Sequence, residues 1–345
     1  MDAVGALGAI AGGRTLTREE ARSTMGSVMA GEATAAQLAA LLTALHVRGE
    51  TVDEIVGFAM AMREAVVPVK ISGTAVDVVG TGGSRIDPFN ISTTAAIVAA
   101  AAGAKVAKHG NRAATGKCGS ADVLEALGVR IDLGPEEAAR CVEEAGIAFL
   151  FAPRYHPAMR HASPVRREIR IRTVFNLIGP ITNPAGVRRM VLGVATPEVG
   201  ERIARALGEL GSDHVLVVHG EEGLDDISPS GRTQTWELRG GMVTTGSIGP
   251  GDLGLKAGAA GEFGSGDAAA NAATVRSIVA GERGTRRTAV LMNAGAGLYV
   301  AGVAESLREG TRLAGAAIDS GAAASTLERF IGTSQRLGAA MAATP

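Results

Sequence analysis

After Pro68 the sequence alternates between short aliphatic, β-branched runs and segments that carry helix-start signals. This alternation constrains the fold more than any other feature, because it predicts a mostly parallel central sheet covered by helices. The expected strands cover residues 76–79, 105–107, 129–131, 148–151, 191–194 and 215–219. The helices between them are expected to begin near Thr93, Ser120, Pro135 and Pro197.

The first seventy residues follow a helical pattern instead. Three capping boxes start 17 residues apart, and a leucine stripe at helical spacing follows the second of them. The boxes are Thr17 with Glu20, Thr34 with Gln37, and Thr51 with Glu54. Three or four short antiparallel helices are expected here. They could form a lid, a dimer surface or both, or they could be only a packing unit.

These patterns predict an α/β protein with a small N-terminal helical domain, residues 1–70, and a large α/β domain, residues 71–345. The proline- and arginine-rich stretch 153–190 is expected to cross back, so that part of 165–190 joins the helical domain. Residues 240–266 are glycine-rich and are expected to include an exposed, mobile loop. Alanine-rich helices are expected from about Asn271 to Leu337.

Three features suited to phosphate follow one another within about one βαβ unit. A glycine-rich turn, residues 80–84, follows a strand, and Ser92 and Thr93 stand where a helix is expected to begin, with its free N–H groups. Lys108 and Arg112 add cations after the next strand. Each feature alone has an ordinary structural explanation, but their order predicts a ligand with several phosphates.

Composition narrows the function further. A net charge of −1 argues against a general nucleic-acid or membrane surface, so an anionic ligand needs local donors. Two cysteines make no disulfide framework and suit a reducing cytoplasm. The N-terminus lacks a basic leader, and the apolar run 95–104 is too short to span a bilayer.

Seven motifs give the chain a specific resemblance, which runs from the first helices to about Glu328. They are GTGGS (80–84), FNIST (89–93), KHGNR (108–112), GSADVLEALGV (119–129), FLFAPRYHPAMRHASPVRRE (149–168), RTVFNLIGPITNPA (172–185) and GLDDIS (223–228). Together they resemble the anthranilate phosphoribosyltransferase family. The resemblance implies transfer of a 5-phosphoribosyl group from phosphoribosyl pyrophosphate to the amine of anthranilate, in tryptophan biosynthesis, by a cytoplasmic homodimer that uses Mg²⁺.

The resemblance also assigns roles residue by residue. It implies that anthranilate contacts Gly80, Asn111, His156 and Arg166, and that Ser92, Asp225 and Asp226 hold the metal. No general base is assigned, because the aromatic amine is already neutral and nucleophilic. The residues implied for the phosphoribosyl donor are Gly80, Thr81, Gly82, Gly83, Ser84, Pro88, Asn90, Ile91, Ser92, Thr93, Lys108, His109, Gly110, Asn111, Arg112, Ala113, Ala114, Thr115, Gly116 and Ser120.

Four positions depart from the family pattern. Ser84 stands where the family usually has Asp, Asp226 where it has Glu, Pro88 where it has Thr or Ser, and Arg170 where it has Gly. Two alternatives stay open. One is a pyrimidine nucleoside phosphorylase-like enzyme, which would share the fold, and the other is a non-catalytic relative that binds nucleic acid.

Overall fold

The computed structural model describes residues 1–84, 86–113, 116–259 and 261–343. Ala114 and Thr115, which were predicted to contact the phosphoribosyl donor, lie outside the described residues.

The N-terminal part is a bundle of helices, as the sequence predicts. All three predicted capping boxes are formed, with both reciprocal hydrogen bonds in each. The predicted leucine stripe of the third helix is buried. The helices are α1 (Ala3–Ala11), α2 (Arg18–Ala30), α3 (Ala35–Arg48) and α4 (Val52–Glu64).

A seven-stranded sheet forms the centre of the α/β domain, with the strand order β3-β2-β1-β4-β5-β6-β7. The first five strands in this order are parallel, and β6 and β7 add an antiparallel edge. The predicted mostly parallel sheet is therefore confirmed. The strands are β1 (Ala75–Gly80), β2 (Lys105–Gly110), β3 (Ile147–Phe151), β4 (Arg189–Gly193), β5 (His214–Gly220), β6 (Thr233–Arg239) and β7 (Met242–Ile248).

Helices cover this sheet. α5 and α13 pack against each other and against β1, whereas α11 packs against β5 and β6 and contacts α4. Fully buried alanines of α5, among them Ala95, Ala96 and Ala99, permit this close packing in a chain with few aromatic residues. The helices are α5 (Ile91–Ala101), α6 (Ser120–Leu127), α7 (Pro135–Ala145), α11 (Gly200–Glu209), α12 (Ala268–Val279), α13 (Thr285–Ala301), α14 (Leu307–Asp319) and α15 (Ala322–Ala343), with 3₁₀ turns η3 (Pro197–Val199) and η4 (Pro250–Leu253). Within the described ranges, no helix combines the length and the apolar character needed to cross a membrane.

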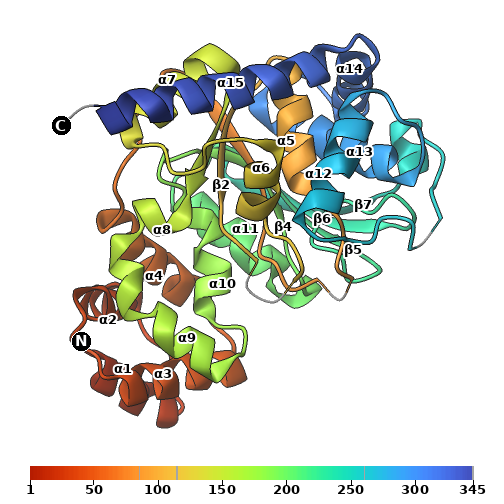
Figure 1. The fold of residues 1–345 in the computed structure, drawn as a ribbon. Helices are drawn as coiled ribbons and strands as arrows, with labels where there is room; N and C mark the ends of the chain where they lie inside the picture. Colours follow the sequence, from red (N-terminus) through yellow and green to blue (C-terminus); the bar gives the residue numbers. More distant parts are fainter. Residues whose placement is uncertain (85, 114–115, 260, 344–345) are drawn as a thin grey trace.

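The segment between β3 and β4 returns to the N-terminal helices. Figure 1 shows α9 and α10 beside the red N-terminal helices, apart from the blue helices of the α/β domain. α9 contacts α3, and α10 contacts both α3 and α4. The segment consists of α8 (Ala152–Tyr155), η1 (Pro157–His161), α9 (Ser163–Ile169), α10 (Val174–Ile178) and η2 (Pro180–Thr182).

One expected strand is absent from the structure, and one observed strand was not expected. Residues 129–131 form no strand, because the N–H of Val129 completes the end of α6 at Leu124 O, 2.9 Å away, and the N–H of Arg130 donates to Ser334 Oγ at 3.0 Å. Within the glycine-rich stretch 240–266, residues 242–248 form the strand β7, which was not among the expected strands. Gly240 and Gly241 have φ values of 58° and 79°, which close a tight β6–β7 hairpin.

Candidate active site

The order of strands along the chain reverses between β1 and β4, and ligands of such sheets bind beyond the carboxyl ends of the strands at this point. Gly80 and Gly193 end these two strands and lie opposite each other in register. A side-chain carbon at either position would collide with Asp225. Glycine at both positions therefore lets the Asp225 loop, which follows β5, close over this point of the sheet.

Asp225 is held by the glycine-rich turn. Its Oδ2 accepts the N–H of Gly82 at 2.7 Å, and its Oδ1 accepts the hydroxyl of Ser84. The hydroxyl oxygen of Ser84 in turn accepts the N–H of Asp225 at 2.9 Å. The predicted metal ligand and the predicted donor-binding turn are thus joined, and each carboxylate oxygen keeps a further lone pair.

A buried cation lies next to the acidic pair. Lys108 is only 2% exposed, and its Nζ donates to Val78 O at 2.7 Å and lies 3.4 Å from Ser92 Oγ. Burial lowers the pKa of Lys108, while the charges of Asp77 and Asp226 raise it. Burial, followed by repulsion from Asp225, raises the pKa of Asp226 well above its usual value. A second cation near this pair would relieve the cost of its buried charge.

These residues fit a hard divalent cation. Asp225 and Asp226 are each 8% exposed and, with the Ser92 hydroxyl, offer only oxygen ligands, as Mg²⁺ prefers. No group of three or more His, Cys, Asp and Glu side chains suited to a metal occurs among the described residues. An ion here would therefore depend on ligand phosphates and water for its remaining oxygens.

Asp77 links three of the motifs from the core side of the site. Its Oδ2 accepts Asn183 Nδ2 at 2.8 Å and the N–H of His109 at 3.2 Å, and Asn183 also donates to Ala107 O at 2.9 Å. Asp77 is fully buried, and burial raises its pKa to about 6 against the opposing charge of Lys108. This carboxyl fixes β1, β2 and the TNP segment relative to one another.

His109 and His156 form a neutral pair. Their ring centroids lie 5.1 Å apart, and both side chains are almost fully buried. Burial lowers the pKa of His109 to about 3 and that of His156 to about 4. Neither imidazole carries charge at neutral pH, so His109 offers a phosphate only a neutral hydrogen-bonding ring.

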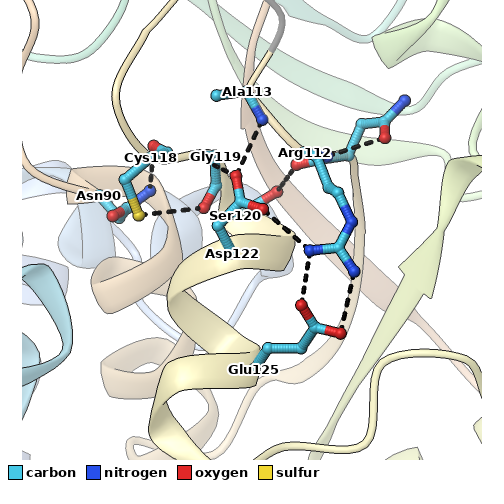
Figure 2. Close-up of polar contacts among 9 residues, drawn as sticks. Asn90, Arg112, Ala113, Cys118, Gly119, Ser120, Asp122 and Glu125 are labelled. Carbon is cyan, nitrogen blue, oxygen red and sulfur yellow. Dashed lines mark hydrogen bonds and ion pairs between the residues drawn. The ribbon is translucent and has the colours of Figure 1, made fainter. Parts of the chain in front are cut away.

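The loop after β2 is held by acidic residues of α6 (Figure 2). Arg112 forms ion pairs with Asp122 at 3.0 Å and with Glu125 at 2.5 Å. Asp122 Oδ2 also accepts the N–H groups of Ala113 and Gly119, at 3.0 and 2.8 Å. The structure thus places Arg112 among carboxylates, while Asn111 is exposed and Ser120 donates to Asn111 O at 3.1 Å.

Two arginines of the crossing segment have different surroundings. The guanidinium of Arg166 lies 5.3 Å from the ring centre of Phe175, and in the described structure no acceptor is hydrogen-bonded to it. Arg172, which was not among the predicted residues, donates to Gly82 O. Burial lowers the pKa of Arg172, and the charge of Asp225 raises it. The guanidinium of Arg166 thus has no ionic partner within the described residues, whereas Arg172 supports the glycine-rich turn.

Other supporting residues were also missed. Asn293 of α13 anchors the acidic loop, with its Oδ1 3.0 Å from Ile227 N and its Nδ2 3.1 Å from Ile227 O. Asn293 could have been singled out from the sequence as a polar residue within an apolar helical segment. Asn183 could have been singled out as part of the TNP motif. Arg172 opens the same motif, whereas Gly193 carried no comparable signal, because only the folded chain brings it to the site.

Comparisons with known proteins identify the family and agree with the fold. The model of the glycosyl transferase family helical bundle domain matches residues 4–66, and that of the family's a/b domain matches residues 72–324. The anthranilate phosphoribosyltransferase of Chloroflexus aggregans is 52% identical over 96% of this chain and 98% of its own.

Solved structures of enzymes with the same name are also similar. The crystal structure of the Thermus thermophilus enzyme has a TM-score of 0.91 at 44% identity, and the similarity covers 97% of this chain and 100% of that one. The Saccharomyces cerevisiae enzyme in complex with PRPP and Mg has a TM-score of 0.89 at 26% identity, covering 97% and 98%.

Proposed function

The chain belongs to the anthranilate phosphoribosyltransferase family, and we propose that it transfers the 5-phosphoribosyl group of phosphoribosyl pyrophosphate to the amine of anthranilate. The observation that carries this proposal is the joining of the glycine-rich turn to Asp225 at the switch point of the sheet. It brings phosphate-binding backbone and carboxylate metal ligands to one place. The products are N-(5-phosphoribosyl)anthranilate and pyrophosphate, and the activity belongs to tryptophan biosynthesis.

The donor is assigned to the carboxyl ends of β1 and β2. The turn 80–84, the first turn of α5 and buried Lys108 supply N–H groups and one positive charge for its phosphates. Asp225, Asp226 and Ser92 would hold Mg²⁺, which supplies counter-charge to the departing pyrophosphate. We also assign to the phosphoribosyl donor the predicted contacts with Pro88, Gly110, Ala113 and Gly116.

The acceptor is assigned to the side of the site that faces the crossing segment. The free fork of Arg166 suits the ortho carboxylate of anthranilate, because a planar guanidinium binds a carboxylate with two parallel hydrogen bonds. Neutral His156 would help to shape uncharged surroundings for the aromatic ring. The residues place the neutral amine against C1 of the ribose, and the rate comes from positioning and electrostatics.

We also propose a homodimer through the N-terminal helices and a cytoplasmic location. An apolar groove of about 610 Å³ lies between α1 and α3, and Val47 on its rim is 80% exposed. A second copy would cover this face. Both cysteines are free and buried, in keeping with a reducing compartment. We also propose that the helical domain comprises residues 1–70 and part of 165–190, and that residues 71–345 form the α/β domain.

A turnover assay tests the activity. Anthranilate fluorescence is expected to fall only when phosphoribosyl pyrophosphate and Mg²⁺ are both present. No loss under any condition, or loss without the sugar donor, would contradict the proposal. Phosphorolysis of thymidine in a parallel assay would instead support the nucleoside phosphorylase alternative.

A further inference from the structure

A buried asparagine of α12 lies behind the donor-binding loops. Asn271 is 1% exposed, and its carboxamide is fully engaged. Its Nδ2 donates to Asn90 Oδ1 at 2.9 Å and to Ser265 Oγ at 3.0 Å, and its Oδ1 accepts the N–H of Gly266 at 2.9 Å. A side chain about 180 residues away in sequence therefore fixes the orientation of Asn90.

Asn90 occupies the N-cap position of α5 but does not cap this helix. Asparagine is among the strongest N-cap residues, because its carboxamide oxygen accepts an N–H of the first turn. Here that oxygen is bound to Asn271, and the Nδ2 of Asn90 donates to Cys118 O at 3.1 Å (Figure 2). Among the described residues, the N–H groups of Ser92 and Thr93 consequently have no hydrogen-bond acceptor.

Two further observations at this helix end point to an anionic ligand. The hydroxyl of Thr93 is buried, at 1% exposure, and has no partner within the described chain. The ammonium of Lys108 is also buried and reaches to 3.4 Å from Ser92 Oγ. Free N–H groups, a free hydroxyl and a buried cation together form a site for phosphate oxygens.

The chain next to Asn271 adds a second tether to the same loop. The N–H of Phe89 donates to Phe263 O at 2.9 Å, and the N–H of Ser265 donates to Asp87 O at 2.8 Å. These bonds align residues 263–265 antiparallel to residues 87–89. These backbone bonds do not involve the Asn271 side chain, although Asn271 also holds Ser265 and Gly266 of the same segment.

We propose that Asn271 is a positioning residue for the sugar donor, because it takes the carboxamide oxygen of Asn90 and so keeps the first turn of α5 uncapped for phosphate. This inference rests on the proposed function. Without Asn271, only the bond from Asn90 Nδ2 to Cys118 O still holds the Asn90 side chain, and its oxygen becomes available to cap α5 in competition with phosphate. One cap hydrogen bond corresponds to about a five- to tenfold loss of affinity.

The test uses Asn271→Asp, which keeps the acceptor for Gly266 but loses the donor to Asn90, and Asn271→Ala, which adds no charge. Calorimetry with inorganic pyrophosphate and Mg²⁺ measures affinity, and NMR amide exchange measures capping. Both variants are expected to bind pyrophosphate about five- to tenfold more weakly. Exchange at the amide of Ser92 or Thr93 is expected to slow in both.

Asp267→Ala is the matched control. Asp267 caps α12 through the N–H of Ala270 at 2.8 Å and has no contact with Asn90, so this variant is expected to melt earlier with unchanged pyrophosphate affinity. Unchanged exchange at Ser92 and Thr93 in the Asn271 variants, or weaker binding in Asn271→Asp alone, would overturn the proposal. Neither measurement depends on turnover. An inactive wild-type protein would therefore contradict the proposed function but would leave this test valid.

Discussion

The contact between Ser84 and Asp225 gives a structural role to Ser84, which stands where the family pattern has aspartate. From the sequence, Ser84 was expected to face the pyrophosphate, where the family's usual aspartate would add a negative charge. In the structure the Ser84 hydroxyl is hydrogen-bonded to the Asp225 carboxylate and to its N–H. Ser84 thus orients a predicted metal ligand, and it does so without a second negative charge.

Ser84→Asp is therefore expected to demand more Mg²⁺. Two carboxylates about 4 Å apart repel by roughly 1 kcal/mol in water and about 4 kcal/mol at an intermediate dielectric constant. A Mg²⁺ titration of turnover is expected to move its midpoint upward by about fivefold or more. Ser84→Ala, which loses the hydroxyl but adds no charge, is the control and is expected to move the midpoint less. Superimposable curves for wild type and Ser84→Asp would contradict the placement of this turn.

The neutral histidine pair predicts how stability depends on pH. Burial lowers the pKa of His156 to about 4, from about 6.5 in an unfolded chain. Between these values the unfolded state binds the additional proton, so stability falls as the pH drops below about 6.5. His109, with a pKa of about 3, acts in the same direction, whereas buried Asp77, whose pKa is raised to about 6, partly opposes it.

His156→Gln is expected to lose less stability on acidification than wild type. Urea unfolding at pH 7 and pH 5 is expected to give a pH-dependent loss that is about 2 kcal/mol smaller in the variant, since one titrating group is gone. The same substitution at exposed His46 serves as the control. Equal losses in wild type and His156→Gln would show that His156 is not held neutral in the folded protein.

At the scale of helices and strands, local signals were predictive and distant partners were not. Each N-terminal capping box involves residues three apart, so the starts of α2, α3 and α4 could be predicted from the sequence. Residues 129–131 have strand-like composition, but the N–H of Arg130 is bound to Ser334, which is 204 residues away in sequence. The β6–β7 hairpin did carry a local signal, the pair Gly240-Gly241, which was missed.

The same limit applies to the site. The glycine-rich turn and the acidic pair could be identified from the sequence, because each follows a strand in a recognisable motif. Lys108 could be identified from the KHGNR motif, although it lies within β2 rather than after it. Asn271 was not predictable as their support, because its contact with Asn90 exists only after the two segments fold together.

The end of α9 carries a backbone conformation that suits glycine. Arg170 has a φ of 51° and is the only non-glycine residue in the described ranges with a positive φ. Glycine adopts this conformation without strain, whereas other residues pay roughly 1–2 kcal/mol. The family pattern has glycine here, so this departure from the pattern costs stability.

Arg170→Gly is expected to stabilise the protein by about 0.5–1 kcal/mol, because the relief of strain exceeds the added entropy of the unfolded chain. The Arg170 side chain is exposed and has no hydrogen-bonded or ionic partner in the described structure, so the substitution removes no contact. Arg167→Gly, inside the same helix, is the control and is expected to destabilise by about 1 kcal/mol. Urea unfolding measures both, and destabilisation by Arg170→Gly would contradict the left-handed helix end.

At the scale of the whole molecule, the two parts of the chain present different surfaces. The α/β domain buries its large apolar side chains with few exceptions, and one of them is Met242 of β7, at 70% exposure. The N-terminal helices expose Val4, and they also expose Val47 on the rim of the groove between α1 and α3. Since no described part of this chain covers that groove, the proposed occupant is the same face of a second copy, as two-fold dimers require.

Val47→Asp is expected to convert the proposed dimer into monomers. A carboxylate on the rim of the groove would have to be buried without a partner, against its own copy across the two-fold axis. Light scattering coupled to size-exclusion chromatography, at several protein concentrations, is expected to show a mass near 35 kDa for the variant and twice that for wild type. Met242→Asp places the same charge on a similarly exposed apolar residue of β7 and is expected to leave the dimer intact. A wild-type protein that stays monomeric at high concentration would contradict the dimer itself, whereas a dimeric Val47→Asp variant would place the interface on another face.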